Sequence, residues 1–341
     1  MQEYPIDIVL PWVDGSDPAW LAERARHAGE AAVSTVDASN ARYRDTGVLR
    51  YLLRSIGRNM PWVRTVHFVT WGHLPSWLDP DAEGLHIVRH EEYIPEKYLP
   101  TFSANTIELN IHRIPGLADH FIYFNDDMLV LRPTKPGDFF IDGLPADYAV
   151  ETILHGKYWR SIAGITLSDM EIINQNFRKR EVLRKNPGKW FNLRYGKEML
   201  KTLLLLPWPY YSDISYDHAA NPFLKETFET VWEKEFPALD ETCRHHFRVV
   251  NDVNQWLMRD WQLVSGKFVP RAPGDAKNYN MTEDLSAIRK AVEGRKHLII
   301  CINDVSYVEI TDYARVKEEL NAIMAKAFPE PSRFEKKEQI L

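Results

Sequence analysis

The chain has 341 residues, of which 45% are hydrophobic and 26% charged, a globular composition long enough for one large domain with an insertion or for two domains. Its net charge of −6 argues against a broad nucleic-acid-binding face, which needs clustered Lys and Arg. The only cysteines, Cys243 and Cys301, lie far apart, which argues against a disulfide framework or a structural zinc site and fits a reducing cytoplasm.

The first half of the chain alternates predicted strands and helices. The N-terminal residues have no basic segment and only a short apolar run, so we expect no signal peptide. Short apolar runs predict strands over residues 6–10, 63–70, 85–89 and 120–124. Helical spacing of apolar residues predicts helices over residues 49–56 and 107–114. This alternation indicates an α/β sheet with both faces covered.

The second half begins with a change of pattern. Residues 166–264 are rich in Trp, Tyr and charged residues at helical spacing, and we expect a mostly helical insertion. The longest candidate for a membrane segment is the apolar run that begins at Leu203, and it breaks at Pro207. It has two interpretations, a buried turn or a patch that docks on a membrane surface, and we favour the buried turn.

The α/β pattern returns near the C-terminus. Residues 297–302 predict a further strand, and a helix is expected from about Asp312. We therefore expect an α/β core with a mostly parallel sheet, formed by residues 1–165 and 265–328. The helical insertion occupies residues 166–264, and residues 329–341 form a charged tail.

Three predicted strands end in acidic or amide side chains, in the segments 14–17, 125–127 and 303–304. Ligands bind at the carboxyl ends of strands in an open α/β sheet, so we expect the three segments to converge on one site. Converging carboxylates repel each other unless a cation lies among them, and hard oxygen ligands indicate Mg²⁺ or Mn²⁺. Such ions bridge carboxylates to phosphates, which predicts a nucleotide or sugar-nucleotide substrate.

Each segment also has a structural interpretation. Asp14-Gly15 is a common turn dipeptide, and Asp17 before a proline is a typical helix cap. Asn303-Asp304 alone would be a turn. The adjacent carboxylates Asp126 and Asp127 are harder to explain in this way, because their mutual repulsion is a cost that a surface turn need not incur. For this pair we favour a functional role.

Phosphoryl transfer also needs a base and cationic side chains. His218 lies just before Pro222 and a predicted helix, and histidine titrates near neutrality. It is one of 12 histidines, so its residue type alone does not select it. Arg248 has the planar guanidinium that clamps a phosphate. By composition alone, a helical ion pair between Arg248 and Asp252 is the simpler interpretation.

Four segments resemble the four conserved regions of the Stealth proteins, in the same order. They are IDIVLPWVDGSDPAW; RYRDTGVLRYLLRSIGRNMPWVRTVHFVTWGHLPSWLD with LPTFSANTIELNIHRIPGLADHFIYFNDDM; residues 218–266; and CINDV. Stealth proteins are bacterial capsular and exopolysaccharide phosphotransferases, related to the animal N-acetylglucosamine-1-phosphotransferase. The resemblance implies a Rossmann-like, nucleotide-diphospho-sugar transferase-like fold, with residues 166–264 on the acceptor side. It also implies transfer of a sugar 1-phosphate from a nucleotide diphosphate sugar, such as a UDP-sugar, to a hydroxyl of a glycan acceptor.

The resemblance further implies roles for individual residues. The residues expected to bind the nucleotide sugar are Trp12, Val13, Asp14, Gly15, Asp45, Arg50, Arg54 and Asn303. Those expected to hold the metal are Asp126, Asp127 and Asp304. Those expected to act in catalysis are Asp127, His218 and Arg248.

Two other functions fit the same residues. A metal-dependent glycosyltransferase would break the sugar carbon–oxygen bond and release a nucleoside diphosphate. A sugar-nucleotide or glycan-binding protein without activity would need no adjacent acidic pair, so we favour it least.

Overall fold

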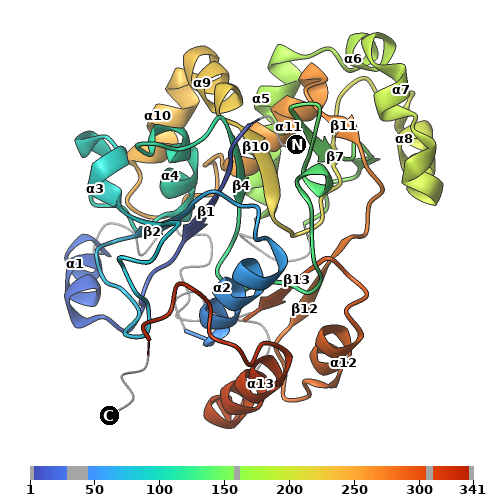
Figure 1. Cartoon of the computed structure of the whole chain (residues 1–341). Helices are drawn as coiled ribbons and strands as arrows, with labels where there is room; N and C mark the ends of the chain where they lie inside the picture. Colours follow the sequence, from blue (N-terminus) through green and yellow to red (C-terminus); the bar gives the residue numbers. More distant parts are fainter. Residues whose placement is uncertain (1–3, 29–44, 157–161, 305–309, 338–341) are drawn as a thin grey trace.

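A computed structural model describes residues 4–28, 45–156, 162–304 and 310–337 (Figure 1). Its main sheet has the strand order β10-β4-β1-β2-β3. The strands are β1 (Ile6–Pro11), β2 (Val66–Thr70), β3 (Leu85–Arg89), β4 (His120–Tyr123) and β10 (Asn221–Leu224). The first four are mutually parallel, and β10 runs antiparallel to β4. The prediction of an α/β fold with a mostly parallel sheet is confirmed.

Helices cover both faces of this sheet, as the buried and apolar strand β1 requires. Ile8 and Leu10 of β1 pack on the side of α2 (Val48–Asn59), whereas Val9 packs in a separate apolar cluster on the other face. The helices that contribute to this other face are α4 (Ala104–Leu109), α5 (Ala163–Asn176), α9 (Lys225–Lys234), α10 (Phe236–Arg244) and α11 (Gln255–Ser265). Alternate side chains of one strand therefore join two cores.

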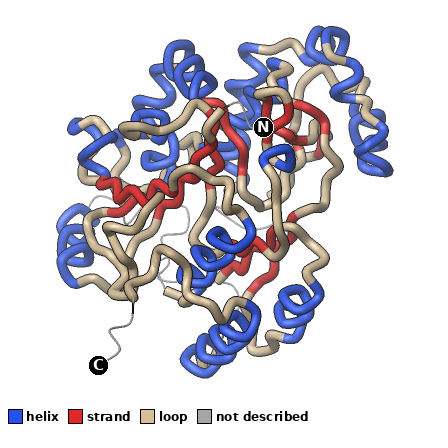
Figure 2. Tube along the Cα trace, in the orientation of Figure 1, coloured by secondary structure: helices blue, strands red, loops and turns tan. Residues whose placement is uncertain are grey.

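The predicted C-terminal strand belongs to a second sheet rather than to the main one (Figure 2). This strand is β13 (Ile299–Asn303), which pairs in parallel with β12 (Ala276–Asn280) and antiparallel with β5 (Met128–Val130). Because β5 follows β4 after a short turn, the two sheets meet at the end of β4. Helices α12 (Ser286–Gly294) and α13 (Tyr313–Ala327) pack on the second sheet.

Residues 166–264 are mostly helical, as expected, but they also complete the main sheet. The predicted helix near residue 223 is wrong, since residues 221–224 form the edge strand β10 and α9 begins at Lys225. Pro222 is tolerated there because an edge strand can lack one hydrogen-bond donor. The apolar side chains of this region share a core with β1 and β4.

The preferred interpretation of the apolar run at Leu203 as a buried turn is wrong. The run forms the end of α8 (Met199–Leu205) and continues just beyond it, and the exposed fractions are 80% for Leu204, 59% for Trp208 and 60% for Tyr210. Consecutive leucines point in different directions around a helix, and here Thr202 takes the buried position.

Shorter elements complete the chain. They are α1 (Pro18–Ala28), α3 (His90–Tyr93), α6 (Lys179–Lys185), α7 (Pro187–Trp190), β6 (Phe140–Ile141), β7 (Leu144–Asp147), β8 (Glu151–Thr152), β9 (Asp213–Ile214) and β11 (Val269–Pro270). Short 3₁₀ turns lie at Glu96–Tyr98, Ile111–Arg113, Pro136–Asp138 and Leu193–Glu198. The described part of the expected charged tail packs on the body, since Phe334 is fully buried and its carbonyl accepts from the backbone of Asp79.

Candidate functional site

The loop after β1 is tied to the end of β2. The backbone N–H of Trp12 donates to the carbonyl of Val69, and the N–H of Asp14 donates to Nε2 of His73 at 2.7 Å. The Asp14 carboxylate accepts from the backbone and hydroxyl of Ser16 at 2.9 and 2.6 Å. Although burial opposes them, these bonds lower the pKa of Asp14. The loop therefore presents an ionised carboxylate at the strand end.

Not every acidic residue of this loop is free for a ligand. Asp17 accepts the backbone N–H of Trp20 at 2.8 Å at the start of α1, so its predicted role as a helix cap is confirmed. His73 was missed by the sequence analysis, and burial lowers the pKa of His73, which favours the neutral ring that accepts from Asp14. Val13 packs beside Trp20 in a small apolar cluster.

Asp126 and Asp127 occupy the turn from β4 to β5, where the two sheets meet. The carbonyl of Asp127 accepts from the backbone of Ile302 in β13 at 2.8 Å. Asp126 is half-buried, and many protein atoms lie around its carboxylate beyond contact distance. Burial and the neighbouring charge of Asp127 together raise the pKa of Asp126 to about 7. This is the unfavourable pairing of carboxylates that the sequence predicted.

Lys317 of α13 connects the acidic segments. Its Nζ lies 3.5 Å from the carboxylate of Asp45, and its charge also lowers the pKa of Asp14. Asp45 in turn helps to raise the pKa of Asp126. The loop after β1, the segment before α2 and the end of β4 therefore lie within electrostatic range of one another. Nothing in the sequence singled out Lys317, because α13 is distant in the chain from the acidic segments.

The β13 end joins this region through Cys301 and Asn303. Burial and the charge of Asp127 raise the pKa of the Cys301 thiol, and that thiol donates to the Asn303 side chain at 3.3 Å. Asp304, the next residue, accepts from the hydroxyl of Tyr313 at 3.1 Å. The three predicted segments therefore approach one another, although β13 reaches the site from the second sheet.

Arg248 lies near the end of β4. Its charge and that of Asp126 both act on the hydroxyl of Tyr123, which donates to Glu108 at 2.9 Å. The helical ion pair with Asp252 is a wrong interpretation, because α10 ends at Arg244 and α11 begins at Gln255, which leaves both residues in the loop between them. Here, the Asp252 carboxylate binds the side chains of His245 and Asn105 and the backbone of Val249.

His218 leaves the sheet at the same edge as Asp126. In the antiparallel pair, Asn221 lies opposite Tyr123, so His218, three residues before β10 begins, is at the same edge as Asp126, three residues after β4 ends. The ring of His218 is half-buried, with its centroid 6.4 Å from that of Trp256. Tyr216 stacks on the same indole with centroids 4.1 Å apart. An aromatic wall therefore flanks His218.

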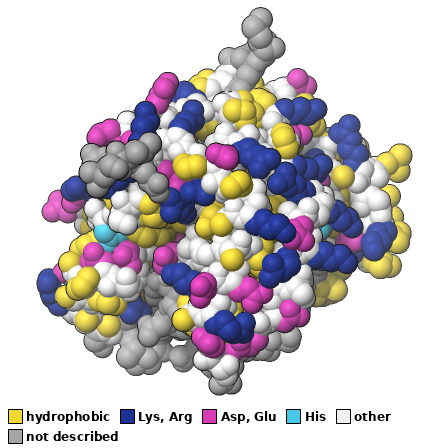
Figure 3. All heavy atoms as spheres, turned by 60° about the horizontal axis from the view of Figure 1, so that its bottom comes forward, with side chains coloured by type: hydrophobic (Ala, Val, Ile, Leu, Met, Phe, Trp, Pro, Cys, Tyr) yellow, Lys and Arg dark blue, Asp and Glu magenta, His cyan; other side chains and the backbone are white. Residues whose placement is uncertain are grey.

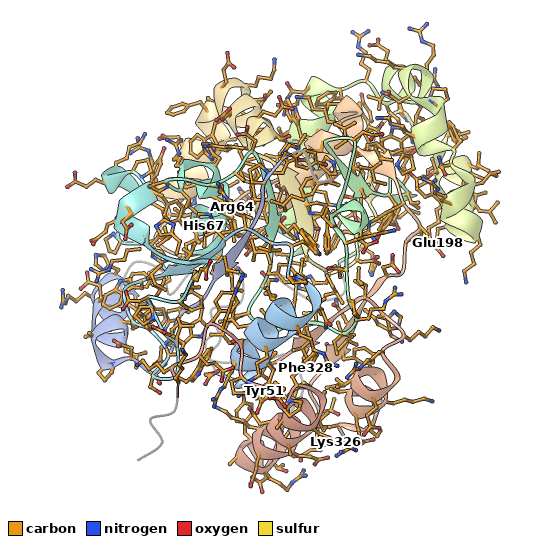
Figure 4. The ribbon with its side chains drawn as sticks, viewed as in Figure 1. Tyr51, Arg64, His67, Glu198, Lys326 and Phe328 are labelled. Carbon is orange, nitrogen blue, oxygen red and sulfur yellow. The ribbon has the colours of Figure 1, made fainter. Side chains whose placement is uncertain are left out.

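Arg50 and Arg54 contact Glu335 near the C-terminus. The Nε atom of Arg54 lies 2.7 Å from one carboxylate oxygen of Glu335, and that of Arg50 lies 2.5 Å from the other. Arg54 also donates to the carbonyl of Phe328, beside Tyr51 (Figure 4). These bonds give both arginines a structural role, and their contact with the nucleotide sugar stays a prediction.

Comparison with known proteins identifies the family. Residues 4–27 match Stealth protein CR1, conserved region 1, and residues 42–146 match Stealth protein CR2, conserved region 2. The chain is 38% identical to "Capsular polysaccharide phosphotransferase WcwK" of Streptococcus pneumoniae, over 97% of this chain and 98% of that protein. It is 39% identical to "Exopolysaccharide phosphotransferase cps2G" of Lactiplantibacillus plantarum, over 98% of this chain and 97% of that protein. The chain belongs to the Stealth family. It is thus an enzyme of the phosphotransferase class.

The two matched Stealth regions cover only part of the candidate site. They contain the loop after β1, Asp45 and the pair Asp126 and Asp127, whereas His218 and Arg248 lie outside them. Among solved structures, the apo-form glycosyltransferase GlyE of Streptococcus pneumoniae TIGR4 is similar with a TM-score of 0.35 at 10% identity, over 97% of this chain and 65% of that chain. A TM-score this low does not support a fold assignment, and the α/β fold is established by the strand order of the main sheet.

Two of the expected metal ligands, Asp126 and Asp127, are adjacent and could hold a metal ion that takes further ligands from a substrate. Within the described parts of this Stealth protein, no three His, Cys, Asp or Glu side chains are grouped as a metal ion would need. Asp126 and Asp127 nevertheless supply adjacent hard oxygen ligands, and burial with mutual repulsion favours a cation beside Asp126. Mg²⁺ is often held by one or two carboxylates, with substrate phosphates as further ligands. The pair therefore fits Mg²⁺ or Mn²⁺ bound together with a phosphorylated substrate.

Proposed function

We propose that this Stealth phosphotransferase moves a hexose 1-phosphate from a nucleotide diphosphate sugar, such as a UDP-sugar, to a hydroxyl of a glycan acceptor. The observation that carries the proposal is the pair Asp126 and Asp127 at the end of β4, where the charge of Asp45 acts on Asp126 and the charges of Asp126 and Arg248 both act on Tyr123. Carboxylates that repel each other beside cationic side chains suit a site that binds a divalent ion with a diphosphate.

The reaction exchanges one phosphorus–oxygen bond for another. The acceptor oxygen bonds to the phosphorus next to the sugar, the bond from that phosphorus to the nucleoside monophosphate breaks, and the product is a phosphodiester. His218 takes the proton of the attacking hydroxyl as a general base. Arg248 stabilises the charge on the phosphoryl oxygens through its planar guanidinium.

The other site residues bind the donor. Asp126 and Asp127 would hold Mg²⁺ or Mn²⁺, which neutralises the diphosphate when bound. The loop Trp12 to Gly15, Asp45 and Asn303 contact the nucleotide sugar, and Lys317 adds positive charge where the first two meet. Asp304, next to Asn303 at the end of β13, would contribute a further carboxylate to the metal site.

The biological role that we propose is capsule or exopolysaccharide synthesis, as the names of the relatives WcwK and cps2G say of those proteins. We further propose that the reaction takes place in the cytoplasm. Both cysteines are buried and form no disulfide, which fits a reducing compartment.

The test is a screen of nucleotide sugars with Mg²⁺ or Mn²⁺ and an oligosaccharide acceptor, followed by nucleotide analysis and phosphorus NMR. We expect release of a nucleoside monophosphate and a phosphodiester signal. Release of a nucleoside diphosphate would instead make the enzyme a glycosyltransferase and overturn the proposal.

Two variants link this reaction to the site. Asp127→Asn should reduce turnover at least about a thousandfold while leaving the fold intact, because it removes a metal-binding charge. His218→Ala should lower kcat by about 10²–10⁴ with little change in donor affinity. Activity of Asp127→Asn close to that of the wild type would contradict the assignment of the metal site.

A further inference from the structure

We propose that the outer face of α8 and the segment after it dock on an anionic lipid surface. This docking surface consists of exposed apolar side chains along residues 193–210. Its members, with their exposed fractions, are Leu193 (88%), Leu200 (58%), Leu203 (39%), Leu204 (80%), Leu206 (38%), Trp208 (59%) and Tyr210 (60%). Of the 12 large hydrophobic side chains exposed in the described chain, seven lie in this short segment. Single exposed leucines need no explanation, but a contiguous patch indicates an interaction site.

The docking surface is held on a firm support. Lys179 is buried, lies 2.6 Å from the carboxylate of Glu151, and donates to the carbonyl of Leu205 at 2.7 Å. On the inner face of α8, the hydroxyl of Thr202 accepts from the backbone of Glu151 at 3.0 Å. The inner face of α8 is thus fixed to the protein through polar contacts, and its apolar face points outward. These contacts show that the exposed apolar face belongs to a helix held against the body of the protein, and not to a helix end that has come loose.

Basic residues accompany the docking surface along the sequence. Residues 178–211 contain nine Lys or Arg and two Glu, a surplus of seven positive charges in a chain whose net charge is −6. Lys179 is buried, but Arg194, Lys197 and Lys201 are exposed within the segment. Of the acidic residues, Glu198 pairs with Lys201 at 2.7 Å (Figure 4). Figure 3 shows hydrophobic side chains projecting at the right-hand edge of the molecule, with Lys and Arg beside them.

The charge pattern selects a lipid surface over a second copy of the chain. In a two-fold dimer built on this face, the same patch would meet itself and bring like charges together. A bilayer with anionic headgroups instead attracts the basic side chains while the leucines enter its interfacial region. Trp208 and Tyr210 suit that region, where indole and phenol rings are enriched.

The docking would be peripheral rather than membrane-spanning. Over residues 4–28, 45–156, 162–304 and 310–337, none of the helices combines the length and the apolar character that crossing a bilayer requires. The docking surface is also independent of the donor and acceptor proposed above, since binding to vesicles can be measured with no substrate present. A failed donor screen and a failed vesicle experiment therefore have separate meanings.

The test is co-sedimentation of the full chain with vesicles of phosphatidylcholine alone or with roughly 40 mol% phosphatidylglycerol. We expect binding to the anionic vesicles that weakens at high salt. The variant Leu204→Ser with Trp208→Ser should bind at least about tenfold more weakly, because it removes a strongly exposed apolar side chain from α8 and another from the segment after it. Lys197→Gln with Lys201→Gln should weaken binding by about tenfold or more.

The matched control is Leu21→Ser. Leu21 is 41% exposed on α1, at the opposite edge of the molecule from α8 (Figure 1), and this variant should bind anionic vesicles like the wild type. Circular dichroism and a thermal melt verify that each variant is folded. Failure of the wild-type chain to bind anionic vesicles would overturn the proposal, as would unchanged binding of the Leu204 and Trp208 variant. A dimer that this variant dissociates, without vesicle binding by the wild type, would assign the surface to a second copy.

Discussion

At the scale of single residues, the acidic pair shows how a binding site conflicts with stability. Asp126 must ionise to attract a cation, yet burial and the charge of Asp127 raise the pKa of Asp126 to about 7. Without a cation, the carboxyl of Asp126 in the folded protein is therefore mostly protonated below about pH 7. The part of the folding free energy that comes from Asp126 is fully present below the unfolded pKa, near 4, and is lost as the pH rises through about 7.

The variant Asp126→Asn should remove this pH dependence. In the presence of EDTA, we expect it to be more stable than the wild type at pH 8, by on the order of 1 kcal/mol, and equally stable near pH 4. Urea unfolding at several pH values measures the difference. Added Mg²⁺ with the donor should then stabilise the wild type more than the variant. Parallel curves for the two proteins at every pH would show that Asp126 is ionised at no cost.

At the scale of elements, the predictions succeeded where the local pattern is sufficient. The strands β1 to β4 are apolar runs of normal length, and α13 has its buried residues Val316, Leu320, Ile323 and Met324 at helical spacing. The edge strand β10 was missed because it contains Pro222, which is rare inside strands. The face of α8 that points outward was also missed, because a leucine-rich sequence does not show whether a partner element covers it.

Helix α2 offers a prediction from its two glycines. Gly47 has φ = +81° before the helix, and an added Cβ would lie 2.4 Å from Oδ1 of Asn321 in α13. Gly57 lies inside the helix, where an added Cβ would make an ordinary contact with Ser332 at 3.6 Å. We expect Gly47→Ala to lower the free energy of unfolding by about 1–3 kcal/mol and Gly57→Ala to raise it by up to about 1 kcal/mol.

Chemical denaturation of both variants tests this contrast. Each variant gains the same methyl group, at Gly47 just before α2 or at Gly57 inside it, so a difference in sign reports on the backbone conformation of Gly47 and its contact with Asn321. Gly47→Ala should also reduce activity, because the backbone N–H of Gly47 donates to Asp45 at 2.8 Å. Equal effects of the two substitutions would refute the strained geometry at Gly47.

At the scale of the whole molecule, the site depends on contacts that the sequence does not reveal. The acidic strand ends could be found locally, because each follows an apolar run. Their cationic and polar partners, Lys317 and His73, lie on other elements, and each is one of many similar residues in the chain. The convergence of Asn303 with Asp127 was expected within one sheet, but it arises from the turn that joins β4 to β5 in the second sheet.

Glu335 attaches the C-terminal segment to α2 through ion pairs with Arg50 and Arg54. Its carboxylate accepts from Arg54, Arg50 and the backbone of Ser332. Burial opposes ionisation, but these donors outweigh it and lower the pKa of Glu335 to about 2. The stabilisation is therefore present above the unfolded pKa of about 4.5 and is lost as the pH falls through about 2. It joins the end of the chain to α2 and, through Phe334, to the loop at Asp79.

The variant Glu335→Gln should test how much these ion pairs stabilise the fold. At pH 7 we expect it to lower the free energy of unfolding by about 1–3 kcal/mol, because two arginines lose their charged partner in a largely buried setting. The difference from the wild type should shrink as the pH falls from about 4.5 towards 2, where Glu335 itself becomes protonated. Glu330→Gln, at an exposed position of the same segment, is the matched control and should change stability little. If both variants unfolded like the wild type at pH 7, the segment would stabilise the fold through the packing of Phe334 and not through the ion pairs of Glu335.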